Sequence, residues 1–244
     1  MKDQQRQNII RALIVEFIGP FALVFVGAGA IIATAGGNLV AIALAHGLAI
    51  GLLVAAAGHI SGGVYNPALT IGLAIARKLS LGLVIPYIVV QLLGATAAAL
   101  CLKAVFPSAA IDKVSLGVPA VGPGFGTGGA FVAEVIMTFF LMFVVYGTAV
   151  DERGPRAIAA LAIGLTITMD IFIGGGASGA AMNPARHFGP ALIGNSWANW
   201  WLWWVAPILG AIIAAALYAY VLQEQSEPPR PDVLDGEIPR DRRV

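Results

Sequence analysis

The chain contains SGGVYNPALTIG at residues 61–72 and a second version of this stretch, SGAAMNPARHFG, at residues 178–189. Six residues are identical in the two stretches and keep a constant offset of 117 positions: Ser61 and Ser178, Gly62 and Gly179, Asn66 and Asn183, Pro67 and Pro184, Ala68 and Ala185, and Gly72 and Gly189. A chance match would not hold one offset through six identities. The sequence therefore contains an internal repeat centred on two Asn-Pro-Ala tripeptides.

The repeat extends well beyond these two stretches. Five residues in the segment 44–50 reappear in the segment 161–167 at the same offset, and five in 16–25 reappear in 134–143 at an offset of 118. Each half of the chain thus contains one copy of a larger unit.

The composition indicates an integral membrane protein. Hydrophobic residues make up 59% of the 244 residues, charged residues make up 11%, and the mean hydropathy is +0.86. So few charged residues cannot cover a soluble globular surface. Apolar runs of about 20 residues suit helices that cross a hydrocarbon core of about 30 Å. The six predicted spans are residues 10–33, 39–58, 81–105, 128–150, 156–173 and 200–223.

Each Asn-Pro-Ala segment is predicted to begin a helix. Asparagine is a favourable N-cap residue, and proline suits the first helical position. A helix over residues 66–78 would be about 20 Å long, too short to cross the membrane. The segment is therefore expected to enter the membrane, become helical at mid-depth and leave on the side from which it came.

Three further spans separate the two copies, so the second segment enters from the opposite face. The predicted fold is an all-α membrane protein with six transmembrane helices and two re-entrant half-helices in an inverted three-span repeat. Placing both termini in the cytoplasm puts most lysines and arginines on that side, which the positive-inside rule favours.

Two half-helices that meet at the membrane midplane direct their positive N-termini at one point. The side-chain amides of Asn66 and Asn183 can donate there to the oxygen of one water molecule. A water held in this way cannot continue a proton wire, and a cation meets two positive dipole ends. The sequence therefore predicts a pore that excludes charge.

The paired Asn-Pro-Ala motifs, the inverted repeat and the glutamates of the first and fourth spans resemble the major intrinsic protein family of aquaporins and aquaglyceroporins. The resemblance covers about residues 11–222. It implies a homotetramer with one pore per subunit, and pore motifs formed by Asn66, Pro67, Ala68, Asn183, Pro184 and Ala185. Residues 1–225 would form one channel domain, with repeat halves at about 10–105 and 128–223.

The family has a four-residue selectivity filter on the extracellular side of these motifs. Counting from the motifs assigns it to His46, Ile171, Ala180 and Arg186. This set differs from the Phe, His and small-residue pattern of strict water channels and is most similar to plant tonoplast intrinsic proteins. The resemblance implies a wider opening that passes water and also ammonia or urea.

Glu16 and Glu134 are interpreted as structural support, as acceptors for backbone donors of the two Asn-Pro-Ala loops, which would otherwise be unpaired in a low-dielectric interior. The alternative is that they are proton-coupling carboxylates. His59 is expected to line the cytoplasmic vestibule.

Three further expectations concern less regular features. Asp170 is expected to brace the loop at residues 174–176, whereas His187, which follows the filter arginine, has no assigned role. Residues 106–128 are rich in glycine and proline and are expected to form an ordered extracellular loop over the pore mouth. Residues 226–244 are expected to form a disordered cytoplasmic tail.

The predicted function is a passive channel for water and small neutral solutes in a lipid bilayer, without cofactor, metal or catalytic constellation. A net charge of +1 gives no indication of a nucleic-acid partner. The preferred location is a prokaryotic cell membrane. Three alternatives remain: a glycerol-type facilitator, a proton-coupled secondary transporter, and a structural protein of the same fold with a closed pore.

Overall fold

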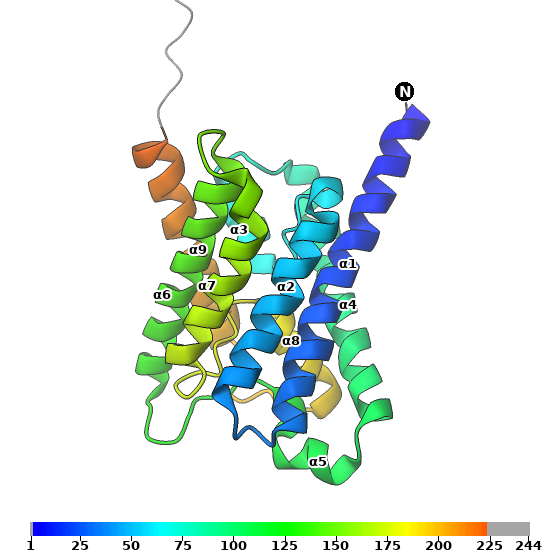
Figure 1. Ribbon diagram of the computed structural model, residues 1–244, viewed down its shortest axis with the longest axis vertical. Coiled ribbons are helices and arrows are strands. Elements are labelled where there is room, and N and C mark those ends of the chain that lie inside the picture. Colours follow the sequence, from blue (N-terminus) through cyan, green and yellow to red (C-terminus); the bar gives the residue numbers. More distant parts are fainter. Residues whose placement is uncertain (1, 224–244) are drawn as a thin grey trace, which may run out of the picture.

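The computed structural model describes residues 2–223, and the expected tail at 226–244 lies outside this range. Within the described residues, six apolar helical segments are long enough to cross a membrane. Their α-helices are α1 (Lys2–Ala33), α2 (Leu39–Ser61), α4 (Leu81–Val105), α6 (Thr127–Val145), α7 (Ala159–Gly174) and α9 (Leu202–Leu217). They stand side by side, and both ends of the described chain lie at the same end of the bundle (Figure 1).

Short helical turns extend three of these spans. The π-helical turns η2 (Tyr146–Val150) and η4 (Tyr218–Leu222) follow α6 and α9, and the 3-10 turn η3 (Arg156–Ile158) precedes α7. The predicted spans agree with these bounds to within a few residues, except that α1 begins eight residues earlier than predicted. Its polar first turns continue the helix beyond the apolar run (Figure 1).

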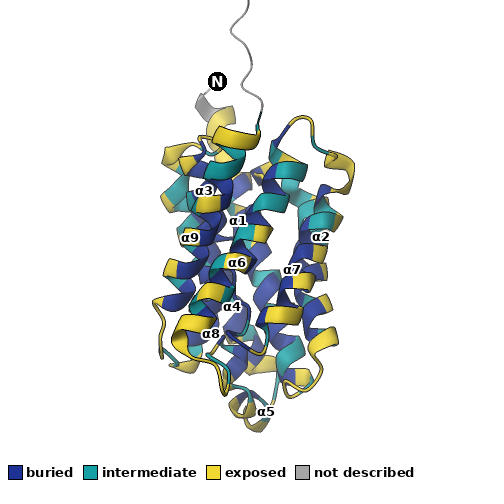
Figure 2. Ribbon diagram, turned by 90° about the vertical axis from the view of Figure 1, so that its left-hand side faces the viewer, coloured by how far each residue is buried: buried dark blue, intermediate teal, exposed yellow. Residues whose placement is uncertain are grey.

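The exposed residues lie on the outside of the bundle, and the buried residues face its interior (Figure 2). Exposed large hydrophobic side chains occur along every span, among them Leu52, Leu81 and Ile173. Glu16, Glu134 and Arg186, in contrast, are buried. This is the inverse of a soluble protein's distribution and suits a surface that contacts lipid.

The inverted repeat is visible in the helix packing. Helix α1 packs against α4, and its repeat equivalent α6 packs against α9. A Cβ at Gly94 would lie 2.1 Å from the Phe17 carbonyl oxygen, and one at Gly210 would lie 2.2 Å from that of Val135. Only glycine permits the backbones to approach so closely, and it occurs at equivalent positions in the two halves.

The two half-helices are α3 (Pro67–Ile75) and α8 (Pro184–Gly194). Asn66 and Asn183 are their N-caps, and proline is the first helical residue of each. Helix α3 lies in one half of the molecule's height and α8 in the other (Figure 1). Each packs against a span of the opposite repeat, α3 on α9 and α8 on α4, so the halves interlock.

Helix α3 is shorter than predicted, because it ends at Ile75 and not at residue 78. Arg77 has a left-handed backbone conformation with φ 58°. The amides of Arg77 and Lys78 then donate to the carbonyl oxygens of Ala74 and Leu73, at 3.0 and 2.8 Å. These two bonds form a Schellman motif, which ends the helix and satisfies its last carbonyl groups.

The connection between the repeats is ordered. It contains α5 (Ser108–Lys113) and the 3-10 turn η1 (Ser115–Gly117), with Leu116 buried against a cluster that includes Ala28. Further along, the amide of Gly122 donates to the Ala177 carbonyl oxygen at 3.0 Å. The connection is thereby attached to the loop that leads into the second half-helix.

Candidate pore and selectivity residues

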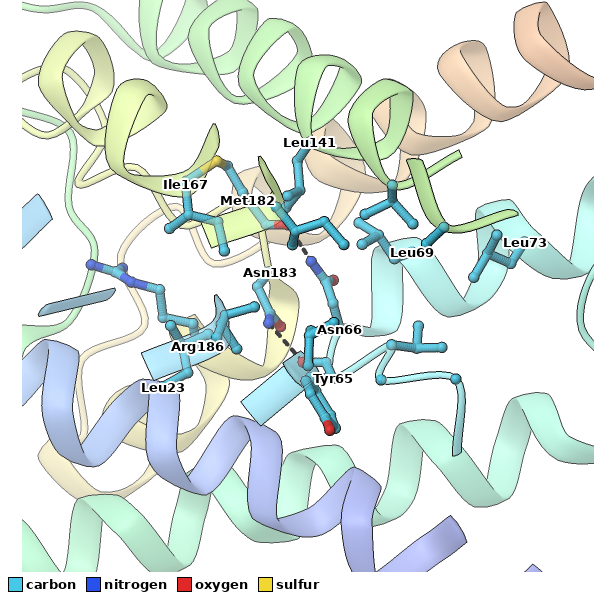
Figure 3. Close-up of a pocket in the computed structure, with 18 of the residues that line it drawn as sticks. Leu23, Tyr65, Asn66, Leu69, Leu73, Leu141, Ile167, Met182, Asn183 and Arg186 are labelled. Carbon is cyan, nitrogen blue, oxygen red and sulfur yellow. Dashed lines mark hydrogen bonds between the residues drawn. The ribbon is translucent and has the colours of Figure 1, made fainter. Parts of the chain in front are cut away.

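A cavity of about 430 Å³ lies among the helices and is lined by residues from both repeats. Its lining includes both asparagines and all four predicted filter residues: His46, Asn66, Ile171, Ala180, Asn183 and Arg186. Arg186 lies on one side of the asparagine pair, whereas Leu69 and Leu73 lie on the other (Figure 3). The asparagines therefore lie between the part of the cavity that contains Arg186 and the part lined by Leu69 and Leu73.

The two half-helices are joined by a reciprocal pair of hydrogen bonds (Figure 3). Asn66 Nδ2 donates to the Met182 carbonyl oxygen at 2.8 Å, and Asn183 Nδ2 donates to that of Tyr65 at 2.9 Å. Each carbonyl group belongs to the residue directly before the other asparagine. The two Asn-Pro-Ala loops are thus bound to each other at the point where their helices begin.

Both asparagine side chains are also fixed by their own helices. Asn66 Oδ1 accepts from the Ala68 amide at 2.9 Å, and Asn183 Oδ1 accepts from the Ala185 amide at 2.9 Å. Each side-chain amide has two hydrogens, and the reciprocal bond uses one of them. The second hydrogen remains available to a molecule in the cavity, in an orientation that the side chain cannot change without breaking two bonds.

Glu16 holds the first loop. Its Oε1 accepts from Ser61 Oγ at 2.7 Å and from the Val64 amide at 3.0 Å, whereas its Oε2 accepts from the Tyr65 amide at 2.7 Å and from Gln91 Nε2 at 2.8 Å. Four donors surround one fully buried carboxylate. The backbone before Asn66, which cannot bond within a helix, therefore has its partners here.

Glu134 holds the second loop in the same way. Its Oε1 accepts from Ser178 Oγ at 2.6 Å and from the Ala181 amide at 2.7 Å, and its Oε2 accepts from the Met182 amide at 2.7 Å. The structure thus places both glutamates against the loop donors that sequence reasoning assigned to them.

Several partners of these loops were not identified from the sequence. Tyr87 Oη donates to the Ser61 carbonyl oxygen at 2.8 Å, and Trp203 Nε1 donates to that of Ser178 at 3.0 Å. The two donors occupy equivalent places in the repeats although their side chains differ, so residue identity could not reveal them. Gln91 was detectable, because it is the single amide side chain in the apolar run 81–105.

The four predicted filter residues have different surroundings. The His46 ring is held at Nδ1, which donates to the Ile42 carbonyl oxygen at 2.8 Å. Ala180 has a left-handed backbone with φ 44°, and Ile171 presents a buried apolar side chain. Arg186 Nε and Nη1 are buried without a hydrogen-bond partner. One side of the cavity therefore holds a cation whose donors are available to a solute.

Three other residues have less direct roles. His59 is exposed at the end of α2 and is not among the residues that line the cavity. Asp170 is buried, and its Oδ2 has no hydrogen-bond partner, so the expected brace of the loop at 174–176 is not formed by this oxygen. His187 is fully buried and stacks on Trp203 with ring centroids 4.6 Å apart.

Six membrane-crossing helices around two half-helices that meet inside a cavity define a multi-pass membrane channel. A sequence model of the family described as "Major intrinsic protein" matches residues 3–218, and the chain belongs to this family. Members of the family are passive channels and not enzymes; the Asn-Pro-Ala motifs, the internal repeat and a tetrameric assembly are typical of it.

The comparisons cover most of the chain. It is 44% identical to "Probable aquaporin TIP-type alpha" of Phaseolus vulgaris over 76% of this chain and 72% of that protein. It is 38% identical to the lens fiber major intrinsic protein of Gallus gallus, over 98% of this chain and 92% of that one. The solved aquaglyceroporin of Plasmodium falciparum superposes with a TM-score of 0.80 at 26% identity, covering 88% and 97% of the two chains.

Proposed function

We propose that the protein is a passive channel for water and for small uncharged solutes such as ammonia and urea, and that it excludes protons and ions. The observation that carries this proposal is the single cavity that joins the asparagine pair to His46, Ile171, Ala180 and Arg186. The similarity to a probable aquaporin supports the water-channel part.

Proton exclusion follows from the fixed asparagines. A water molecule between Asn66 and Asn183 accepts from both free amide hydrogens, so its own hydrogens turn away from the centre. A chain of water molecules then has opposite orientations on the two sides, and no proton can pass along it. The N-termini of α3 and α8 repel a cation at the same place.

The solute range follows from the filter. Arg186 supplies donors to a neutral polar solute and repels cations, whereas Ile171 offers no polar partner and Ala180 occupies little space. An opening built in this way admits molecules somewhat larger than water. Glycerol facilitators usually have Asp directly after the filter arginine, where this chain has His187, and a charged residue where it has Ala191. Glycerol should therefore pass less readily than urea.

Stopped-flow measurements on proteoliposomes test this function. Vesicles with the protein should shrink faster than empty vesicles in hyperosmotic buffer, and should take up ammonia and urea faster, with glycerol slower. Shrinkage no faster than that of empty vesicles would show a closed pore. Uphill solute movement driven by a pH gradient would instead show a proton-coupled transporter, and rapid glycerol entry would show a glycerol-type facilitator.

The assembly and topology are part of the same proposal. Residues 1–225 form one channel domain, the subunits form a homotetramer, and both termini are cytoplasmic, as the lysine and arginine distribution supports. The similar proteins named above come from a plant, a vertebrate and Plasmodium falciparum, so they lend no support to a prokaryotic cell membrane.

A further inference from the structure

Gly27 on α1 lies directly against the ring of His46 on α2. A Cβ atom at Gly27 would lie 2.4 Å from both Cδ2 and Nε2 of His46 and 2.7 Å from Cε1. Carbon atoms in contact are normally about 3.5–4.0 Å apart, so the ring occupies the space that a side chain at position 27 would need. The absence of a side chain there forms a recess in α1.

The recess receives the end of the ring that bears Nε2. His46 Nδ1 lies 2.8 Å from the Ile42 carbonyl oxygen, and this oxygen can only accept, so Nδ1 carries the hydrogen. In the neutral ring Nε2 is then an acceptor, and it is buried without a partner. The His46 ring is therefore fixed at both ends, by the hydrogen bond at Nδ1 and by the contact with Gly27 at Nε2.

The ring also lines the cavity, as do the other three predicted filter residues. If the recess were filled, the ring would have to move away from α1, and the cavity is the open space beside it. We propose that Gly27 is a selectivity-determining residue of the channel, which sets the width of the outer filter by receiving the His46 ring. This inference rests on the proposed function for the solutes involved, but its geometry concerns the pore for any solute.

The test is the Gly27→Ala variant, with Gly29→Ala as the matched control on the same helix. A Cβ at Gly29 would meet only side-chain atoms, Leu102 Cδ2 at 3.3 Å and Phe106 Cε2 at 4.0 Å. In stopped-flow measurements, the ratio of urea to water permeability should fall about tenfold in Gly27→Ala, the lower part of the range that one added methylene group produces in a fitted site. Gly29→Ala should keep the wild-type ratio.

A second background separates selectivity from general helix packing. In His46→Ala protein the ring is absent, so adding Gly27→Ala should change neither the permeability ratio nor the yield of folded protein in size-exclusion chromatography. A folded Gly27→Ala protein with the wild-type ratio would overturn the proposal. So would an effect, or a failure to fold, that persists unchanged when His46 is alanine.

The outcome is separable from that of the proposed function. If the wild-type protein passes water but no urea, the solute proposal fails, and the Gly27 proposal is then tested on water alone. Gly27→Ala should in that case lower the water permeability per channel, Gly29→Ala should not, and the difference should disappear in the His46→Ala background. Equal water permeability of the two single variants would overturn it.

Discussion

One buried glutamate binds the backbone of each pore loop. Glu134 has acceptor oxygens on both sides, each bound to a backbone amide of the second loop. A glutamine at this position presents an NH₂ group to one of these amides, so a buried donor loses its partner. Two carboxylate oxygens are therefore needed to pair both amides of the second loop.

Glu134→Gln should therefore lower the free energy of unfolding by about 1–3 kcal/mol, the cost of one buried unsatisfied donor. Thermal unfolding in detergent measures this as a lower melting temperature. Asp112→Asn, which changes an exposed acid in α5, is the control and should leave the melting temperature unchanged. An equally stable Glu134→Gln protein would contradict the supporting role.

His46 is the predicted filter residue whose identity bears most on the proposed solute range. His46→Phe should keep water permeability and lower ammonia and urea permeability by about tenfold, because a larger apolar ring replaces a polar one in a fitted site. Stopped-flow uptake of the three solutes measures the change. Unchanged ammonia and urea uptake would show that His46 is not part of the filter.

Residue identities in the site were predictable where the repeat or the motif spacing constrained them. Asn66, Asn183, Glu16 and Glu134 stand at matched positions, so they emerged from the sequence. Gly27 did not, because its importance comes from a contact between two spans that no spacing reveals. Tyr87 and Trp203 were missed because the two halves use different side chains for one hydrogen bond.

At the scale of elements, the asparagine that begins each half-helix also binds the loop of the other half-helix. Asn66 both caps α3 and donates to the Met182 carbonyl oxygen. Asn38 offers a matched comparison, because it caps the full span α2 by accepting from the Ala41 amide at 3.0 Å, at the surface. Asn38 therefore acts as a helix cap alone, whereas Asn66 acts as a cap and also binds the other half of the molecule.

Asn38→Ala should cost about 1 kcal/mol of stability, the typical value of an N-cap, and should leave water permeability unchanged. Asn66→Ala should cost more, because the Met182 carbonyl group loses its donor in addition, and should reduce water permeability. Thermal unfolding and stopped-flow shrinkage measure the two effects. Equal losses in both variants would mean that the cross-connection contributes no stability.

Element ends were less predictable than element identities. The apolar runs located all six spans, because lipid requires long uninterrupted apolar segments. The end of α3 was misplaced by three residues, because the sequence offers no glycine at the Schellman position and Arg77 takes the left-handed conformation instead. Local side-chain preference was a poor guide where the surrounding fold determined the backbone.

At the scale of the whole molecule, an ion pair outside the membrane spans helps to hold two parts of the second repeat together. Arg153 Nη2 lies 2.7 Å from Asp151 Oδ2 and also donates to the Leu222 carbonyl oxygen at 3.1 Å. The hydrogen bonds from Arg153 lower the pKa of the Asp151 carboxyl from 3.8 to about 2. The loop after α6 is thereby connected to the end of the last span.

This lowered pKa predicts a pH dependence of stability. A carboxyl group whose pKa is lower in the folded state stabilises the fold above its unfolded pKa and loses this effect as pH falls through the folded value. Asp151→Asn should therefore lower the melting temperature by a constant amount above about pH 4, and the difference should shrink between about pH 4 and 2. In Arg153→Gln protein, the same substitution should show little pH dependence.

The reciprocal asparagine bonds also bear on how the protein is made. The partners of the Tyr65 carbonyl group and the Asn66 amide are residues 183 and 182, which leave the ribosome more than a hundred residues later. Helix α3 packs on α9, the last of the six spans in the described residues. The first three spans can therefore be made before these partners exist, and their pore segment stays incomplete until α9 is in place. An unfinished chain would thus lack the second half of its pore.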